Sequence, residues 1–250
     1  MIFLCIVNHN HDDMIINNKD LIEITKNFNV LIKSNTEATD KLKRFSQDYN
    51  IQLLDESYGL GFGSNNNYAF NYLKETNQIS DSDFFLVINP DVTITLKQLE
   101  KLQEQIVAIP SDIYTINLFQ DNQWTISEPS IKRFPSLFGP IKGLINKNNR
   151  NDAYDKSKIT QPTLIDWAAG SFLLFTKNAF ERLNGFNDKY FMYFEDVDIC
   201  RRAKIKKMHL MYLPSIKATH IGAFNNRNIL SKHFRWYLIS YFRYHFLVIL

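Results

Sequence analysis

The chain has 250 residues, of which 45% are hydrophobic and 22% charged, and its formal net charge is +3. This length suffices for one sizeable domain, and this composition excludes a disordered or fibrous chain. Cys5 and Cys200 both lie in apolar surroundings, which argues against a disulfide framework or a zinc site and fits a reducing compartment. No run of about 18 uncharged apolar residues occurs, so no membrane-spanning helix is expected.

Strand-like and helix-like segments alternate along the first 118 residues. The expected strands are 2–7, 30–32, 51–54, 84–88 and 113–118. The expected helices are 39–49, 65–75 and 96–107. This alternation predicts an α/β fold with a mixed, mostly parallel sheet flanked by helices, which binds ligands at the carboxyl ends of its strands.

The segment 119–163 has a different character. It contains four prolines and a polar run at 146–152, which predicts a long, partly mobile loop region. Such a region can be a surface excursion or a lid over an acceptor. Strand and helix patterns return at 171–176 and 178–183.

Positive charge is concentrated at the end of the chain. Ten of the 29 Lys and Arg lie in 201–250, which has no Asp or Glu, whereas the first 200 residues hold 19 basic and 26 acidic side chains. Within 231–250, Lys232, Arg235 and Arg243 are mixed with aromatic residues. This pattern is typical of an amphipathic helix at a membrane interface, although a helix packed on the domain is an alternative. Nucleic acid is not expected as a partner, because no sequence-reading module occurs.

Short polar side chains and glycines follow the first strands. Asn8 and Asn10 come after the first strand and Asn35 after the second, where they can hydrogen-bond a nucleobase. Gly61 and Gly63 belong to a glycine loop before a helix, where the backbone can approach a phosphate closely. Each of these features is also compatible with ordinary turn chemistry.

Acidic residues occur at two places that suit catalysis or metal binding. Asp91 follows the strand 84–88, at a position where a carboxylate can hold Mg²⁺ or Mn²⁺. Glu195, Asp196 and Asp198 follow an aromatic run, and such a cluster indicates proton transfer, cation binding or merely the start of a helix. His220 becomes a candidate ligand only if the fold brings it close to Asp91.

Taken in order, these pieces resemble the family 2 glycosyltransferases, which are inverting enzymes with the GT-A fold. The resemblance covers nearly the whole chain and is closest to the bacterial rhamnosyltransferases of O-antigen and cell-wall polysaccharide assembly, the enterobacterial O-antigen dTDP-rhamnosyltransferase in particular. The shared landmarks are 61–63 (GFG) with 65–67 (NNN), 89–91 (NPD), 166–171 (DWAAGS), 185–187 (GFN), 190–202 (YFMYFEDVDICRR), His220 and 234–236 (FRW).

The resemblance implies roles for the acidic and metal-binding candidates. Asp196 would be the catalytic base, with Glu195 as the second choice. Asp91 would hold a divalent cation, Mg²⁺ or Mn²⁺, on the donor diphosphate, and His220 would be a further ligand. Asn89 stands where the family has the first acid of its Asp-x-Asp motif, which implies modest metal affinity.

The resemblance also implies two binding pockets. The donor-binding residues would be Asn8, Asn10, Asn35, Gly61, Gly63, Asn66, Asn89 and Asp91. The sugar and acceptor pocket would be formed by Trp167, Gly170 and Tyr193. Ser34 replaces the usual Asp of the second-strand loop, which weakens the expected base contact there.

The implied activity is transfer of L-rhamnose from dTDP-L-rhamnose to an undecaprenyl-diphosphate-linked saccharide, on the cytoplasmic face of the inner membrane. Residues 1–225 would form the catalytic domain, with a nucleotide-sugar half (1–118) and an acceptor half (119–225), followed by a membrane-associating helix (226–250). Alternatives are another donor, such as UDP-galactofuranose or a UDP-hexose, and a non-catalytic membrane-surface protein with a degenerate fold.

Overall fold

The computed structural model describes residues 1–137, 152–222 and 232–247. Its strands are β1 (Ile2–Asn8), β2 (Asn29–Ser34), β3 (Gln52–Asp55), β4 (Phe84–Ile88), β5 (Val92–Thr93), β6 (Ile113–Phe119), β7 (Ile131–Lys132), β8 (Thr163–Leu164), β9 (Trp167–Ala168), β10 (Phe172–Thr176) and β11 (Leu210–His220). Its helices are α1 (Asp12–Ile16), α2 (Lys19–Ile24), α3 (Asp40–Asp48), α4 (Phe62–Glu75), α5 (Leu96–Ala108), α7 (Lys177–Arg182), α8 (Glu195–Ile205) and α9 (Lys232–Phe242), with the short helical turns η1 (Lys156–Lys158) and η2 (Arg243–Leu247). Most of the polar run 146–152 and the chain end 248–250 lie outside the described residues.

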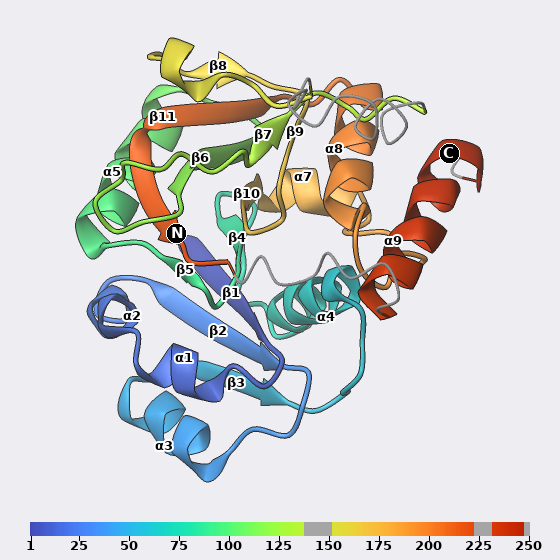
Figure 1. Ribbon diagram of the computed structural model, residues 1–250. Coiled ribbons are helices and arrows are strands. Elements are labelled where there is room, and N and C mark those ends of the chain that lie inside the picture. The colour runs from blue at the N-terminus through green and yellow to red at the C-terminus, as the bar shows by residue number, and fades with distance from the viewer. Residues whose placement is uncertain (138–151, 223–231, 248–250) are drawn as a thin grey trace.

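One mixed sheet forms the centre of the described structure (Figure 1). Its strand order is β3-β2-β1-β4-β10-β6-β11-β5, and β8 pairs with β11. The neighbours β3, β2, β1 and β4 are parallel, whereas β10 is antiparallel to both β4 and β6. Because parallel neighbours point the same way, the loops after β1, β2 and β4 meet at one edge of the sheet. The predicted α/β fold with a mixed, mostly parallel sheet is confirmed.

Alternate residues of the central strands face two separate cores. In β1, Phe3 and Cys5 contribute to the core that includes residues of α4, α7 and α8. Ile2, Leu4 and Ile6 contribute to the other core, with residues of α1, α2, α3 and α5. Helices therefore cover both faces of the sheet, and the sheet is buried between them (Figure 1).

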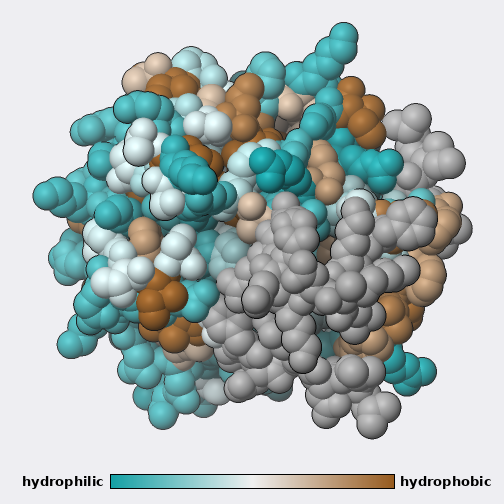
Figure 2. Space-filling model, turned by 45° about the horizontal axis from the view of Figure 1, so that its top comes forward, coloured by the Kyte–Doolittle hydropathy of each residue, from teal (hydrophilic) through white to brown (hydrophobic). Residues whose placement is uncertain are grey.

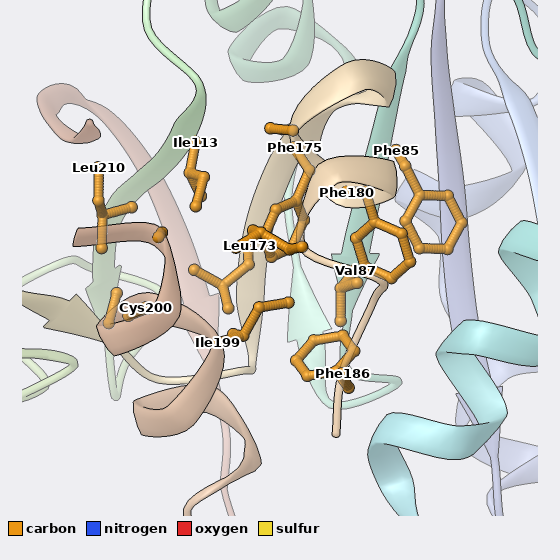
Figure 3. Packing of buried hydrophobic residues seen from close by; sticks show 14 of the residues in the cluster. Phe85, Val87, Ile113, Leu173, Phe175, Phe180, Phe186, Ile199, Cys200 and Leu210 are labelled. Atoms are coloured by element: carbon orange, nitrogen blue, oxygen red, sulfur yellow. The ribbon is translucent and has the colours of Figure 1, made fainter. Parts of the chain in front are cut away.

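The first core is rich in aromatic rings that meet edge to face. Phe180 of α7 lies against Phe175 and Phe186, with ring centroids 5.1 and 5.8 Å apart (Figure 3). Cys200 of α8 packs into the same core, and it and Cys5 are buried free thiols, as expected from their apolar surroundings.

The segment 119–163 was expected to be a long loop region, and its described part corrects that expectation. β7 pairs with β9, β8 joins the main sheet beside β11, and Ser127 bridges to Phe119. These strands are only two residues long and take their partners from distant segments, so no local period in the sequence can reveal them.

The helix expected over 231–250 is present in the described residues as α9 and η2, which lie beside the N-terminal end of α8 (Figure 1). None of the described helices is both long and apolar enough to cross a membrane. Figure 2 shows tan and brown surface along the right-hand edge of the molecule, the side on which Figure 1 places α9.

Candidate active site

Asn8, at the end of β1, is fully buried and engaged in hydrogen bonds within the protein. Its Nδ2 donates to Asp12 Oδ1 and to Ser34 Oγ, at 2.8 Å each, and its Oδ1 accepts from the backbone N–H of His11 at 2.9 Å. These bonds hold the loop after β1 against the end of β2. Ser34, where the family has an acid, is therefore part of the scaffold below the expected nucleobase site.

Asn35 connects the loop after β2 to the glycine loop. Its Nδ2 donates to the carbonyl of Leu60 (2.9 Å), its Oδ1 accepts from the Leu60 N–H (2.8 Å), and its own carbonyl accepts from the Gly59 N–H (3.1 Å). Asn10 is exposed at a φ of 60°, with its backbone N–H bonded to Thr36 Oγ1. Of the three predicted nucleobase contacts, only Asn10 has an exposed side chain.

Gly61 and Gly63 allow close packing of protein against protein. A Cβ atom on Gly61 would lie 2.5 Å from the carbonyl oxygen of Phe191, and one on Gly63 would lie 2.6 Å from the Cβ of Phe186. The sequence suggested that these glycines make room for a ligand. The structure shows that they make room for the segment 186–191, so their side-chain direction is already occupied.

Asn66 and Asn89 are two further residues expected in the donor site. The Asn66 side chain is fully buried, with its Nδ2 donating to the Phe62 carbonyl at 2.9 Å and its Oδ1 without a hydrogen-bond partner. Asn89 follows β4 directly, and its backbone N–H donates to the carbonyl of Ser171 at 3.1 Å. This bond joins the end of β4 to the start of β10.

The fold brings His220 next to Asp91. This proximity was the condition under which His220 becomes a candidate metal ligand. Both residues extend from paired segments at the sheet edge, because His220 pairs with Val92 in the β11–β5 ladder. His220 Nε2 lies 3.2 Å from Asp91 Oδ1. Burial disfavours the charged form of His220, but its bonds to Asp91 and to Glu128 outweigh this effect and raise its pKa to about 9. The imidazolium in turn lowers the pKa of Asp91, overcoming the opposing effect of burial.

Glu128 is a site residue that the sequence did not reveal. Its carboxylate oxygens lie 3.0 Å from His220 Nδ1, on the side of the ring opposite Asp91, and only 8% of the residue is exposed. Lys156 is close by, with its Nζ bonded to Ser130 Oγ (2.8 Å) and the Leu118 carbonyl (3.2 Å). Burial lowers the pKa of Lys156 to about 8, against the opposing charge of Glu128. Both residues come from 119–163, where no motif or period singles them out.

Glu195 and Asp196 are the first two residues of α8. Asp196 Oδ2 accepts from the Gly170 N–H (3.0 Å) and its Oδ1 from the Val197 N–H (2.8 Å). Glu195 is 7% exposed, and its Oε2 has no hydrogen-bond partner. Burial, followed by the negative charge of Asp196, raises the pKa of Glu195 to about 8. Burial also raises the pKa of Asp196, but the two N–H donors oppose that shift. Burial and mutual repulsion therefore disfavour ionisation of both groups, and the two N–H donors favour Asp196 as the carboxyl that ionises first.

Asp198, the third acid of the cluster, is buried and paired with an arginine of the same helix. Its Oδ2 accepts from Arg202 Nε at 2.7 Å, one turn along α8, and its side chain is 1% exposed. The cluster is thus both a helix start and a buried carboxylate pair, and only Glu195 and Asp196 remain as candidates for proton transfer.

The three expected pocket residues differ in their surroundings. Trp167 is buried, with its Nε1–H donating to the Arg133 carbonyl at 2.8 Å. Gly170 is buried and donates to Asp196, as described above. Tyr193 is partly exposed, and its hydroxyl lies 3.1 Å from Nδ1 of His233 in α9.

Short backbone links join the Asp91 turn to the carboxylate pair. Asn89 N–H donates to Ser171, and the adjacent Gly170 N–H donates to Asp196. The four sequence landmarks around positions 61, 89, 170 and 195 therefore lie side by side in the fold. A carboxylate with an imidazole is found on one side of this junction, and a protonatable carboxylate pair on the other.

Two solved structures share this fold. The structure titled GalNAc-T7 with UDP, GalNAc and Mn²⁺ superposes with a TM-score of 0.63 at 12% identity, covering 97% of this chain and 47% of that one. Residues 1–349 of S. aureus TarS give a TM-score of 0.58 at 14% identity, covering 88% of this chain and 60% of that one. The fold is the GT-A fold.

The sequence comparisons narrow this class. A family profile described as the N-terminal domain of galactosyltransferase matches residues 158–226. The rhamnosyltransferase WbbL of Escherichia coli K12 is 34% identical over 98% of this chain and 92% of its own length. An N-acetylglucosaminyl-diphospho-decaprenol L-rhamnosyltransferase of Mycobacterium tuberculosis is 27% identical over 76% of this chain and 66% of its own length. The chain belongs to the rhamnosyltransferase family of GT-A glycosyltransferases, as its sequence landmarks predicted.

Proposed function

We propose that the enzyme transfers L-rhamnose from dTDP-L-rhamnose to a saccharide on a polyprenyl diphosphate, in the synthesis of O-antigen or a related cell-surface polysaccharide. The observation that carries this proposal is the buried Glu195–Asp196 pair among the family landmarks, in which Asp196 accepts two backbone N–H bonds. The names of the relatives from E. coli and M. tuberculosis support rhamnose as the sugar, and the second name supports a lipid-diphosphate acceptor.

In this mechanism Asp196 is the base of a single displacement. Its carboxylate takes the proton of the acceptor hydroxyl while that oxygen forms a bond to the anomeric carbon, and the bond from this carbon to the diphosphate oxygen breaks. The configuration inverts and dTDP leaves with the electron pair. Gly170 and Val197 orient the carboxylate through their N–H groups, and Glu195 keeps its own proton, so the negative charge stays on Asp196.

Asp91 and His220 are the residues that would hold a divalent cation. Asp91 Oδ1 lies 3.2 Å from His220 Nε2, so a carboxylate oxygen and an imidazole nitrogen are adjacent. If His220 releases its proton when a cation binds, this donor set would suit Mn²⁺ or Mg²⁺. In the described parts of the chain, no group of three His, Cys, Asp or Glu side chains could hold a metal alone, so donor oxygens must complete the shell. A bound cation supplies charge neutralisation of the leaving diphosphate.

The remaining donor and pocket residues stay predictions. Asn10 is the exposed candidate for the base, and Tyr193 the partly exposed candidate for the acceptor. The bonds and packing described above would stabilise the loops of the donor pocket. They involve Asn8, Asn35, Gly61 and Gly63.

The enzyme is proposed to act at the cytoplasmic face of the inner membrane, where α9 meets the lipid. The outward side of α9 and η2 exposes Ile239, Phe242 and Phe246, each by more than half, and Lys232 and Arg235 lie on the same helix. This combination fits an anionic bilayer surface.

An assay over a panel of nucleotide sugars with a lipid-linked acceptor tests the function. We expect turnover with dTDP-L-rhamnose, loss of turnover with EDTA, and a fall of roughly 10²–10⁴-fold in Asp196→Asn with donor binding retained. The control is Asp198→Asn, which makes the same charge change on the same helix and should keep transfer. Preference for a UDP-sugar would overturn the donor, and near-normal turnover of Asp196→Asn would overturn the base.

A further inference from the structure

The catalytic carboxylates follow a strained turn. Tyr193 and Phe194 have φ values of 69° and 66°, in the left-handed region that aromatic residues rarely adopt. Phe194 is the N-cap residue of α8 and makes no side-chain capping bond. The Phe194 carbonyl accepts from the Asp198 N–H at 2.8 Å, and further contacts to the turn come from distant segments.

Several contacts to the turn come from α9 and from η2, which carries Tyr244. Ser240 Oγ donates to the Met192 carbonyl at 2.9 Å, and the Tyr193 hydroxyl meets His233 Nδ1 at 3.1 Å. The Phe194 ring lies among three tyrosine rings, with centroid distances of 5.6 Å to Tyr237, 5.9 Å to Tyr241 and 5.4 Å to Tyr244.

The opposite side of the turn is held by α4. The Phe62 N–H donates to the Phe191 carbonyl at 3.0 Å, and the absence of a Cβ on Gly61 allows that close approach. The 191–194 turn is therefore contacted by both α4 and α9, two helices that are far apart in the sequence. If α9 loosens, Phe194 can leave the left-handed region, and the first residues of α8 then change direction.

We propose that α9 is a positioning element of the active site, in which Ser240, Tyr237 and Tyr241 hold the 191–194 turn so that Asp196 keeps its geometry. The proposal rests on the assignment of Asp196 as the base. It gives α9 two functional faces, because the residues that grip the turn differ from the exposed Ile239, Phe242 and Phe246.

The proposal separates positioning from simple stability. The two cores around the main sheet are built from β-strands and other helices, and α9 contributes only the partly buried Tyr237 and Tyr241 at the margin of one of them. Loss of one α9 contact should therefore leave the fold intact and change the chemical step.

The test uses the full-length chain with a water-soluble acceptor analogue, so that lipid binding is not required. Ser240→Ala should lower kcat by roughly fivefold, as expected for one lost hydrogen bond, and leave the KM for the donor unchanged. Ser240→Thr, which keeps the hydroxyl, should restore kcat. Tyr237→Leu should lower kcat by roughly tenfold, whereas Tyr237→Phe keeps the ring and should behave as wild type.

The control is Ile205→Ala, which lies at the opposite end of α8 from Asp196 and is 54% exposed, and this variant should keep the wild-type kcat. Hydrogen exchange of the peptide 191–200 gives a readout independent of turnover, and it should accelerate in Ser240→Ala and Tyr237→Leu only. Equal kcat and equal exchange in all variants, with an active wild type, would overturn the proposal. If the wild type transfers no sugar but exchange of 191–200 is still faster in Ser240→Ala and Tyr237→Leu, α9 does hold the 191–194 turn and the proposed function is contradicted.

Discussion

Glu195 and Asp196 are adjacent in the chain, but their surroundings stabilise a negative charge to different extents. Asp196 receives two backbone N–H donors, whereas Glu195 has an oxygen with no partner in a buried position. A carboxylate without donors is poorly solvated when ionised, so the donors favour Asp196 as the carboxyl that ionises first. The side-chain environment therefore supports the proposal of Asp196, rather than its neighbour Glu195, as the base.

The raised pKa of Glu195 predicts how stability depends on pH. The folded protein holds this proton up to about pH 8, whereas an unfolded Glu releases it near its ordinary pKa of 4.5. The folded state thus binds more protons in this window, and stability should fall as pH rises through it. Glu195→Gln cannot lose a proton, so its Tm should exceed that of wild type by a margin that grows from about pH 5 to about pH 8. Thermal melts of both proteins across this pH range measure the difference in Tm. A difference that shrinks as pH rises would contradict a raised pKa of Glu195.

At the scale of elements, the N-terminus of α4 packs against the segment 186–191, which precedes α8. A Cβ atom on Gly61 would lie 2.5 Å from the Phe191 carbonyl oxygen, and one on Gly63 would lie 2.6 Å from the Phe186 Cβ and 3.7 Å from the Glu195 Cβ. The two glycines thus allow the fit between α4 and the segment that leads into α8, and through it the placement of the carboxylate pair.

Gly61→Ala tests this fit. Its Cβ would meet the Phe191 backbone at 2.5 Å, and because backbone cannot rotate away, the 191–194 turn must shift. We expect a loss of stability of about 1–3 kcal/mol, measured by urea unfolding, and a fall in kcat. Ser64→Ala, on the same helix, removes only a hydrogen bond to Asp188 near the surface and should cost about 1 kcal/mol or less with transfer retained. Wild-type kcat in Gly61→Ala would show that the contact does not position the pair.

At the scale of the whole molecule, charge and apolar surface coincide at the end of the chain. The last 50 residues have no acidic side chain, and the outward side of α9 and η2 exposes Leu238, Ile239, Phe242 and Phe246 by 37–57%. The Glu195–Asp196 pair directly follows the turn that α9 contacts. A surface that binds lipid at α9 would therefore present the active site to a substrate carried in the membrane.

The double variant Phe242→Ser with Phe246→Ser tests this surface. Two apolar rings would no longer enter the lipid, and binding to anionic liposomes should weaken by roughly tenfold or more in a flotation assay. Val107→Ser provides the control, because Val107 is 77% exposed at the end of α5 and should not affect binding. Unchanged flotation of the double variant would remove α9 from the membrane contact.

The sequence by itself determined the alternation of strands and helices, the GT-A resemblance, and the identity of Asp91, Glu195, Asp196 and His220 as candidates. These signals are local, because they depend on periodicity and on short motifs. It could not determine which of two adjacent acids keeps its charge, since that depends on N–H donors from Gly170 and Val197.

Only the tertiary structure decided the contacts between distant segments. It placed His220 beside Asp91 across paired strands, added Glu128 from a segment without any motif, and assigned the glycines at 61 and 63 to helix packing. It also showed that α9 contacts the 191–194 turn, which precedes the two carboxylates. Such contacts join residues as far apart in the sequence as Gly61 and Phe191. No local pattern encodes them, because burial and hydrogen-bond partners exist only once the chain has folded.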